Sequence, residues 1–148
     1  MSLEGRITTA MREAMKARQA DRVATLRMAM AAATNRRIEL GHPLTDSETI
    51  GVLDKQVKQR RESAELYRAG GRPELADQEE AEIAILVEFL PVALAEAELD
   101  ALIAAAIAET GASGPADMGK VMGKLVPQTT GRADGRMVSD KVRAALSG

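Results

Sequence analysis

The sequence contains no cysteine and no tryptophan, and only one phenylalanine, one tyrosine and one histidine among 148 residues. The absence of cysteine excludes disulfide bonds and thiolate chemistry. The single histidine, His42, lies between Gly41 and Pro43, where we interpret it as a loop residue. One histidine without cysteine makes no convincing metal site, and no Ser/His/Asp triad can be assigned. We therefore predict no metal, no cofactor and no catalytic residue.

Long apolar runs are also missing. No continuous apolar segment is long enough to cross a bilayer, and no signal peptide is visible, so we expect a cytoplasmic protein with no membrane contact. The net charge is −2, so composition alone gives no overall basic signal for nucleic acid.

The near-neutral total hides an uneven distribution of charge. Residues 1–45 carry eight cations against four acids, residues 70–100 carry one cation against nine acids, and residues 101–148 carry six cations against four acids. One interpretation is mutual neutralisation between packed helices. The other is that a basic end of the chain faces an anionic partner.

Hydrophobic residues make up 45% of the chain, and they are mainly Ala, Leu, Ile, Val and Met. Apolar residues recur at the helical period and no apolar/polar alternation stands out, so we predict an all-α protein of about seven helices. A short linker after Pro91 predicts two helical subdomains, a four-helix part over residues 1–92 and a three-helix part over residues 93–148.

Turn chemistry predicts where several helices begin and end. We expect Asp21 to cap the second helix, and Thr45 with Glu48 to form a capping box before the third. Pro73 suits a first helical position, and Pro127 is expected to break the sixth helix. The apolar stripes are expected to include three residues near helix ends, namely Met15, Ile38 and Met137.

Arg60 interrupts the apolar stripe of the third helix, and Glu79 falls similarly within the stripe of the fourth. A short turn between these helices predicts an antiparallel hairpin that brings Arg60 near Glu79 or Glu82. We interpret this as a partly buried ion pair that fixes helix register. An Arg held for an anionic ligand, or one whose charged end reaches solvent, are the alternatives.

The last third of the chain displays regularly spaced cations. Lys120 and Lys124 lie one helical turn apart, and Arg132 and Arg136 flank a glycine-containing turn. Glycines let a backbone approach a ligand closely, and Arg offers bidentate contacts to phosphate. The alternative is a helix-initiating turn with solvated arginines.

Four segments carry a more specific signal: VKQRRES at 57–63, EFLP at 88–91, DMGKVM at 117–122 and GRADG at 131–135. Their order and separations resemble those of the YqeY-like proteins of the GatB/YqeY family, over nearly the whole chain. The resemblance implies a free-standing bacterial protein of two all-helical subdomains. It also relates the chain to the C-terminal tail of the aminoacyl-tRNA amidotransferase B subunit, which helps to hold tRNA.

The resemblance implies the tRNA-gripping appendage and not the reaction, because the catalytic domain of the larger subunit is absent. The family-wide label of carbon–nitrogen ligase with glutamine as amide donor is interpreted as inherited from that subunit. By resemblance, Lys120, Lys124, Arg132 and Arg136 are the RNA-binding candidates, and alanine at either arginine is expected to weaken binding without harming the fold. With so few aromatic rings, bound RNA is expected to be recognised by shape and phosphate contacts.

The leading hypothesis from the sequence is thus a non-catalytic module that binds tRNA weakly. The alternatives are a protein–protein adaptor that docks a translation enzyme, and an accessory subunit of a glutamine-dependent amidotransferase.

Overall fold

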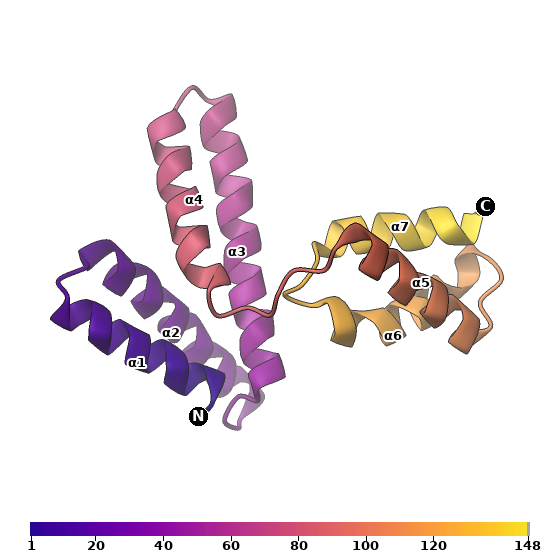
Figure 1. Cartoon of the computed structure of the whole chain (residues 1–148), viewed down its shortest axis with the longest axis horizontal. Coiled ribbons are helices and arrows are strands. Elements are labelled where there is room, and N and C mark those ends of the chain that lie inside the picture. Colours follow the sequence, from indigo (N-terminus) through magenta and orange to yellow (C-terminus); the bar gives the residue numbers. More distant parts are fainter. Residues whose placement is uncertain (148) are drawn as a thin grey trace. The chain divides into compact units, whose positions relative to one another are not determined.

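The structure is a computed structural model that describes residues 1–147 of the chain. The described residues form seven α-helices and one short 3₁₀ turn without any strand, which confirms the all-α prediction. They divide into two compact units, Met1–Leu90 and a second unit that begins at Pro91. The expected boundary, after residue 92, lies two residues further along. Each unit has its own core and is described by itself (Figure 1).

The first unit consists of two helical hairpins, α1 with α2 and α3 with α4 (Figure 1). The helices are α1 (Leu3–Lys16), α2 (Ala20–Leu40), α3 (Asp46–Ala69) and α4 (Pro73–Val87). One apolar stripe on each helix turns inward, as the 3.6-residue period predicts. The buried core contains Leu3, Ile7, Leu26, Ala29, Leu53, Val57, Leu86 and Phe89.

The capping box at the start of α3 is confirmed. The Glu48 amide donates to Thr45 Oγ1 at 3.1 Å, and the Glu48 carboxylate accepts from the Thr45 amide at 2.9 Å. That backbone hydrogen bond from Thr45 is the main reason why the pKa of Glu48 lies below its ordinary value. Pro73 is the first residue of α4, also as predicted.

The expected Asp21 cap is wrong, because α2 begins one residue before Asp21, at Ala20. Arg18 adopts a left-handed conformation with φ 58°, and the Gln19 amide donates back to the Ala14 carbonyl at 3.0 Å. This tight exit from α1 brings the chain into α2 earlier than the sequence suggested. Asp21 lies in the first turn of α2, where the helix dipole favours an acid.

Three predicted stripe residues are instead exposed: Met15 at 51%, Ile38 at 73% and Met137 at 48%. Ile38 follows Ala33 by five residues, and a step of that size turns the side chain away from the buried face. Met137 precedes the buried Val138 and therefore points about 100° away from it. Met15 lies in the last turn of α1, at the edge of the stripe.

The second unit contains α5 (Glu96–Thr110), α6 (Met118–Thr129) and α7 (Gly135–Ser147), with a 3₁₀ turn at Pro115–Asp117 before α6. Its core comes from all three helices and contains Leu99, Ile103, Ala106, Val121, Leu125, Val138, Val142 and Leu146. Gly111, in a left-handed conformation with φ 66°, ends α5 as expected.

Pro127 does not break α6, which continues to Thr129. Proline removes only the donor to the carbonyl of Gly123, which lies at an exposed position. Side chains bond to the three carbonyls that follow. Gln128 donates to Lys124 O at 3.0 Å, Thr129 to Leu125 O at 3.1 Å and Thr130 to Val126 O at 2.7 Å. Gly131, with φ 76°, then turns the chain toward α7.

Candidate nucleic-acid interface

The outward face of α6 carries two of the predicted cations beside an almost bare strip of backbone. Lys120 and Lys124 are exposed and one helical turn apart. Gly119 and Gly123 occupy neighbouring outward positions, where an added Cβ would meet no atom within 4 Å. Each glycine lowers the stability of a helix by roughly 0.5–1 kcal/mol relative to alanine. No close packing against the two glycines within the described chain offsets this loss. The strip lets a large surface come close to the helix beside two ammonium groups.

Lys120 has an acidic neighbour. Its Nζ lies 3.7 Å from the Asp117 carboxylate, which also accepts a hydrogen bond from the Ser113 amide at 3.0 Å. The Ser113 amide is the main reason why the pKa of Asp117 is lowered, and the charge of Lys120 lowers it further. Asp117 is therefore ionised at neutral pH and offsets part of the Lys120 charge. Lys124 has no ion-pair partner among the described residues.

Arg132 helps to build the turn in which it lies. Its Nε donates to the Val92 carbonyl at 3.0 Å, while its backbone carbonyl accepts from the Leu94 amide at 2.9 Å. The Arg132 amide donates to Thr129 O at 2.8 Å. Arg132 therefore ties segment 92–94 to the end of α6, and the expectation that alanine at this position leaves the fold intact is not supported by these contacts. Its two terminal amino groups form no hydrogen bond with the described residues and stay available to an anion.

Arg136 lies in the first turn of α7, is exposed, and forms no ion pair with a described residue. The other two cations of α7 are paired. Lys141 contacts Asp100 at 2.9 Å and Glu96 at 3.1 Å, and these hydrogen bonds, that of Asp100 first, raise the pKa of Lys141. Arg143 pairs with Asp140 at 3.2 Å. Lys124 and Arg136 are thus the unpaired cations of this unit, with the free end of Arg132 between them in sequence.

The four predicted residues lie on α6 and on the segment that follows it. Arg132 lies in the connection from α6 to α7, Arg136 lies in the first turn of α7, and Lys124 is near the middle of α6. Lys120 precedes Lys124 by one helical turn, about 6 Å along the helix axis, on the same exposed face.

Arg60 is buried in the first unit, at 6% exposure. Its Nε donates to Glu82 at 3.1 Å, and its Nη1 donates to the Gln56 side-chain oxygen at 2.7 Å and to the Gln56 carbonyl at 3.2 Å. Nη2 lies 3.8 Å from the Met28 sulfur. The guanidinium joins α2, α3 and α4 and is occupied by the protein's own groups, so it is not positioned for an external anion. Glu79, the other expected partner, forms no ion pair with Arg60.

His42 is an exposed loop residue. Its Nδ1 lies 2.8 Å from the Pro43 carbonyl, and its Nε2 is 3.6 Å from Glu48. No group of three or more His, Cys, Asp or Glu side chains within residues 1–147 is arranged to hold a metal ion. None of the described helices is long and apolar enough to span a bilayer.

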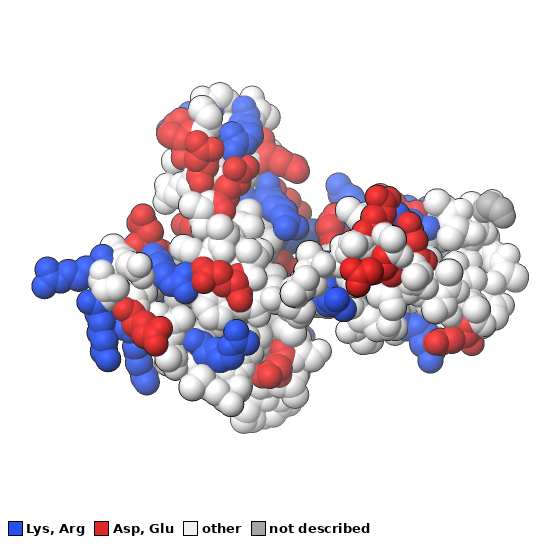
Figure 2. Space-filling view, in the orientation of Figure 1, with Lys and Arg blue, Asp and Glu red and all other residues white. Residues whose placement is uncertain are grey.

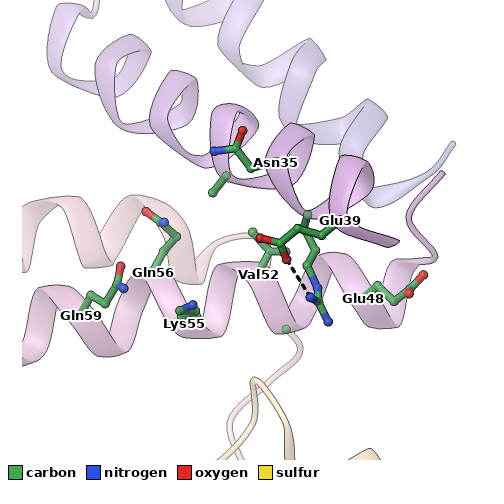
Figure 3. A pocket seen from close by; sticks show the side chains of 10 residues that line it. Asn35, Glu39, Glu48, Val52, Lys55, Gln56 and Gln59 are labelled. Carbon is green, nitrogen blue, oxygen red and sulfur yellow. Dashed lines mark hydrogen bonds and ion pairs between the residues drawn. The ribbon is translucent and has the colours of Figure 1, made fainter. Parts of the chain in front are cut away.

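A cavity of about 600 Å³ opens between α2 and α3 in the first unit. Figure 3 shows polar side chains around it, including Asn35 from α2 and Lys55 and Gln59 from α3. Two other lining groups are already engaged, because Arg36 pairs with Glu39 at 2.9 Å and Gln56 accepts from Arg60. The cavity contains none of the residues that the sequence singled out for RNA, and no charge of one sign prevails in it.

Gly119 and Gly123 were missed as site residues. The signal was present in the sequence, since residues 119–124 read GKVMGK, with a glycine–lysine pair repeated at helical spacing. The role of Arg132 had no such signal, because its partners Val92 and Leu94 lie about forty residues away in the sequence.

Comparison with known proteins supports a single family. The sequence model of the YqeY-like protein family matches residues 4–146. A protein of the fungus Pyrenophora tritici-repentis named "Altered inheritance of mitochondria protein 41, mitochondrial" is 28% identical over 145 residues, covering 95% of this chain and 79% of its own length. A protein of the same name from Lachancea thermotolerans is 29% identical over 140 residues, covering 92% and 74%. An uncharacterized protein of Schizosaccharomyces pombe is 31% identical over 90 residues, covering 61% and 73%.

Proposed function

This chain belongs to the YqeY-like protein family, and from that premise we propose that it is a non-catalytic helical module that grips folded tRNA through phosphate contacts. The proposed contact residues lie in the second unit, and they are Lys120, Lys124, Arg132 and Arg136. The proposed setting is translation in the cytoplasm, in association with a tRNA-handling enzyme such as a tRNA amidotransferase. Two of the fungal relatives are named as mitochondrial proteins, which concerns those proteins.

The observation that carries the proposal is the combination of unpaired cations with the bare face of α6. Lys124 and Arg136 are exposed without an acidic partner in the described chain, whereas Lys141 and Arg143 are paired. Beside them the two open glycines remove side-chain bulk. Phosphates attract such cations without any need for aromatic stacking, which suits a chain whose single Phe is buried.

The test is a titration of labelled tRNA at several salt concentrations. About four phosphate contacts would give a slope of log affinity against log salt near −3. The variant Lys124→Gln/Arg136→Gln is expected to weaken binding and to make that slope shallower by about two contacts, because each neutralised phosphate releases its counterions. Both residues are exposed and unpaired, so the far-UV spectrum and Tm should stay unchanged.

The matched control is Lys58→Gln/Arg61→Gln, which removes the same charge from exposed positions of α3. It is expected to bind tRNA nearly as the wild type does. If the wild type shows no tRNA binding even at low salt, or if the two double variants behave alike, the proposal fails. The protein–protein adaptor would then be the better hypothesis.

A further inference from the structure

A second group of unpaired cations lies in the first unit, at the α1–α2 hairpin. We call it the basic edge, and it consists of Arg12, Lys16, Arg18 and Arg27. All four are exposed, and none forms an ion pair or side-chain hydrogen bond with a described residue. Figure 2 shows Lys and Arg side chains projecting where this hairpin turns.

Three of the four other cations of the same two helices are paired, and only Arg6 is exposed without an ion pair to a described residue. Arg22 contacts Glu88 at 2.6 Å, Arg36 contacts Glu39 at 2.9 Å and Arg37 contacts Glu4 at 3.3 Å. Pairing with another segment therefore accounts for Arg22 and Arg37, and pairing within α2 accounts for Arg36, but neither accounts for the basic edge. Only two acids, Glu13 and Asp21, are close to the edge in sequence, so a net positive charge remains there.

The helical geometry places these cations on the outward faces of the two helices and in the turn between them. Arg12 and Lys16 are one turn apart on the outward face of α1, and Arg18 follows directly in the turn. The Thr8 hydroxyl lies 3.6 Å from the Met30 sulfur, which sets the register of the antiparallel pair. In that register Arg12 falls opposite the part of α2 that contains Arg27. The edge thus continues from α1 across the turn to α2.

Arg18 adds an independent observation. It is the one non-glycine residue with positive φ in the described chain, at 58°, whereas the other left-handed positions are all glycines: Gly41, Gly71, Gly111 and Gly131. Left-handed backbone disfavours a residue with a Cβ. At its other left-handed positions the chain has glycine, which adopts this conformation without strain, but here it has an arginine next to other exposed cations. Backbone strain of this kind is often found at functional sites.

The chemistry of the edge favours phosphate over a lipid surface. Three of the four cations are Arg, whose planar fork matches phosphate oxygens. Helices that lie on membranes insert Trp, Phe or Leu beside their cations. Here the exposed neighbours on α1 are Thr9, Glu13 and Met15, and the chain has no Trp.

We propose that the basic edge is a second contact surface for the phosphates of the same folded tRNA. This inference rests on the proposed function and extends it from the second unit to the first. Because both units belong to one chain, contacts by the edge act intramolecularly once the second unit is bound. They raise the affinity beyond what either surface achieves alone.

The test compares Arg12→Gln/Lys16→Gln/Arg27→Gln with a charge-matched control, Lys55→Gln/Lys58→Gln/Arg61→Gln on α3, in the tRNA titration. With the edge bound, the wild-type slope is expected to be about two to three units steeper than the value near −3 from the second unit alone. The edge variant is expected to lose that difference and to weaken binding at least about tenfold at 0.1 M salt. The control is expected to stay within about twofold of the wild type, because it removes equal charge elsewhere. Circular dichroism confirms that each variant is folded.

Arg18→Gly separates binding from folding. Glycine relieves the left-handed strain, so Tm is expected to stay the same or rise while tRNA affinity falls several-fold. An edge variant that binds like the control, while Lys124→Gln/Arg136→Gln still weakens binding, overturns this inference and leaves the proposed function standing. A wild type that binds no tRNA removes both. Edge-dependent binding to anionic phospholipid vesicles, with tRNA binding unchanged, assigns the edge to membranes and overturns the RNA assignment.

Discussion

At the scale of single residues, Arg60 shows how a cation is held inside a helical unit. It occupies an apolar stripe position of α3, yet every nitrogen of its guanidinium has a neighbour: Glu82, Gln56 or the Met28 sulfur. A buried cation without such partners would be strongly unfavourable. Because three helices contribute partners, the side chain fixes how α2, α3 and α4 meet. The guanidinium is also buried, since the Arg60 side chain is only 7% exposed, so it offers little surface to an external ligand.

We expect Arg60→Met to lower the free energy of unfolding by about 1–3 kcal/mol, because it leaves Glu82 and Gln56 without their donor. The larger loss of stability that is typical of a fully buried ion pair is not expected, because the Glu82 side chain is 24% exposed and therefore partly solvated. Chemical denaturation measures the difference. Arg61→Met, at an exposed position, should change the stability by about 0.5 kcal/mol or less. Equal stability of Arg60→Met and wild type would show that the pair is dispensable.

At the scale of single elements, α6 combines two features that a helix selected only for stability would avoid. It carries two glycines on its outward face and a proline in its last turns. The proline removes one donor, to the carbonyl of the exposed Gly123, and the Gln128, Thr129 and Thr130 side chains bond to the carbonyls that follow. No contact in the described chain offsets the stability lost at the two glycines. We infer that they are present because a binding partner approaches this face of α6.

Gly119→Ala/Gly123→Ala should therefore separate stability from binding. Alanine meets no atom within 4 Å at either position, and we expect a gain of roughly 0.5–1 kcal/mol for each substitution. If tRNA packs against the bare strip, its affinity should fall although no charge has changed and the salt slope is kept. Denaturation and tRNA titration on the same variant test both parts. Unchanged affinity would exclude close approach at this face and leave the cations as the contact.

Local turn chemistry was sufficient to predict most elements. The capping box of Thr45 and Glu48, Pro73 at a helix start and Gly111 at a helix end are all signals that act within a few residues. The end of α6 could not be predicted, because tolerance of Pro127 depends on whether the Gly123 carbonyl, which loses its donor, lies at an exposed position. The left-handed Arg18, which moved the start of α2, breaks the preference on which such predictions rely.

The site residues divide in the same way, into features that local sequence predicts and features that depend on contacts distant in sequence. Exposure of Lys120, Lys124 and Arg136 could be expected from their spacing on the outward side of amphipathic helices. The ion pairs and hydrogen bonds that engage some of the cations could not be expected from this spacing. The pairing of Lys141 with Asp100 and Glu96 joins residues more than forty positions apart, as does the bond from Arg132 to Val92.

At the scale of the whole molecule, the net charge does not show where the unpaired cations lie. Residues 1–90 carry 14 cations and 15 acids, and residues 91–148 carry six cations and seven acids, so each unit has a net charge of −1. Among the described residues, unpaired cations nevertheless occur in groups, at the basic edge and on α3 (Lys55, Lys58 and Arg61) in the first unit and around the α6–α7 connection in the second. A partner with closely spaced phosphates senses those local surfaces more than the distant acids, which are screened beyond about 10 Å at 0.1 M salt.

The purified protein is expected to show neither glutaminase nor amidotransferase activity. Glutamine hydrolysis needs an activated nucleophile, and this sequence has no cysteine and a single histidine. That histidine, His42, lies in an exposed loop with its ring nitrogens directed at the Pro43 carbonyl and at Glu48, and no hydroxyl group within residues 1–147 forms a hydrogen bond with it. The sequence also offers no glycine-rich phosphate cradle for ATP. Incubation with glutamine, ATP and mischarged Glu-tRNA, followed by measurement of released ammonia and of amidated tRNA, tests this directly. Turnover that His42→Ala abolishes would place a catalytic site in this chain, whereas activity that appears only with an added amidotransferase would favour an accessory subunit.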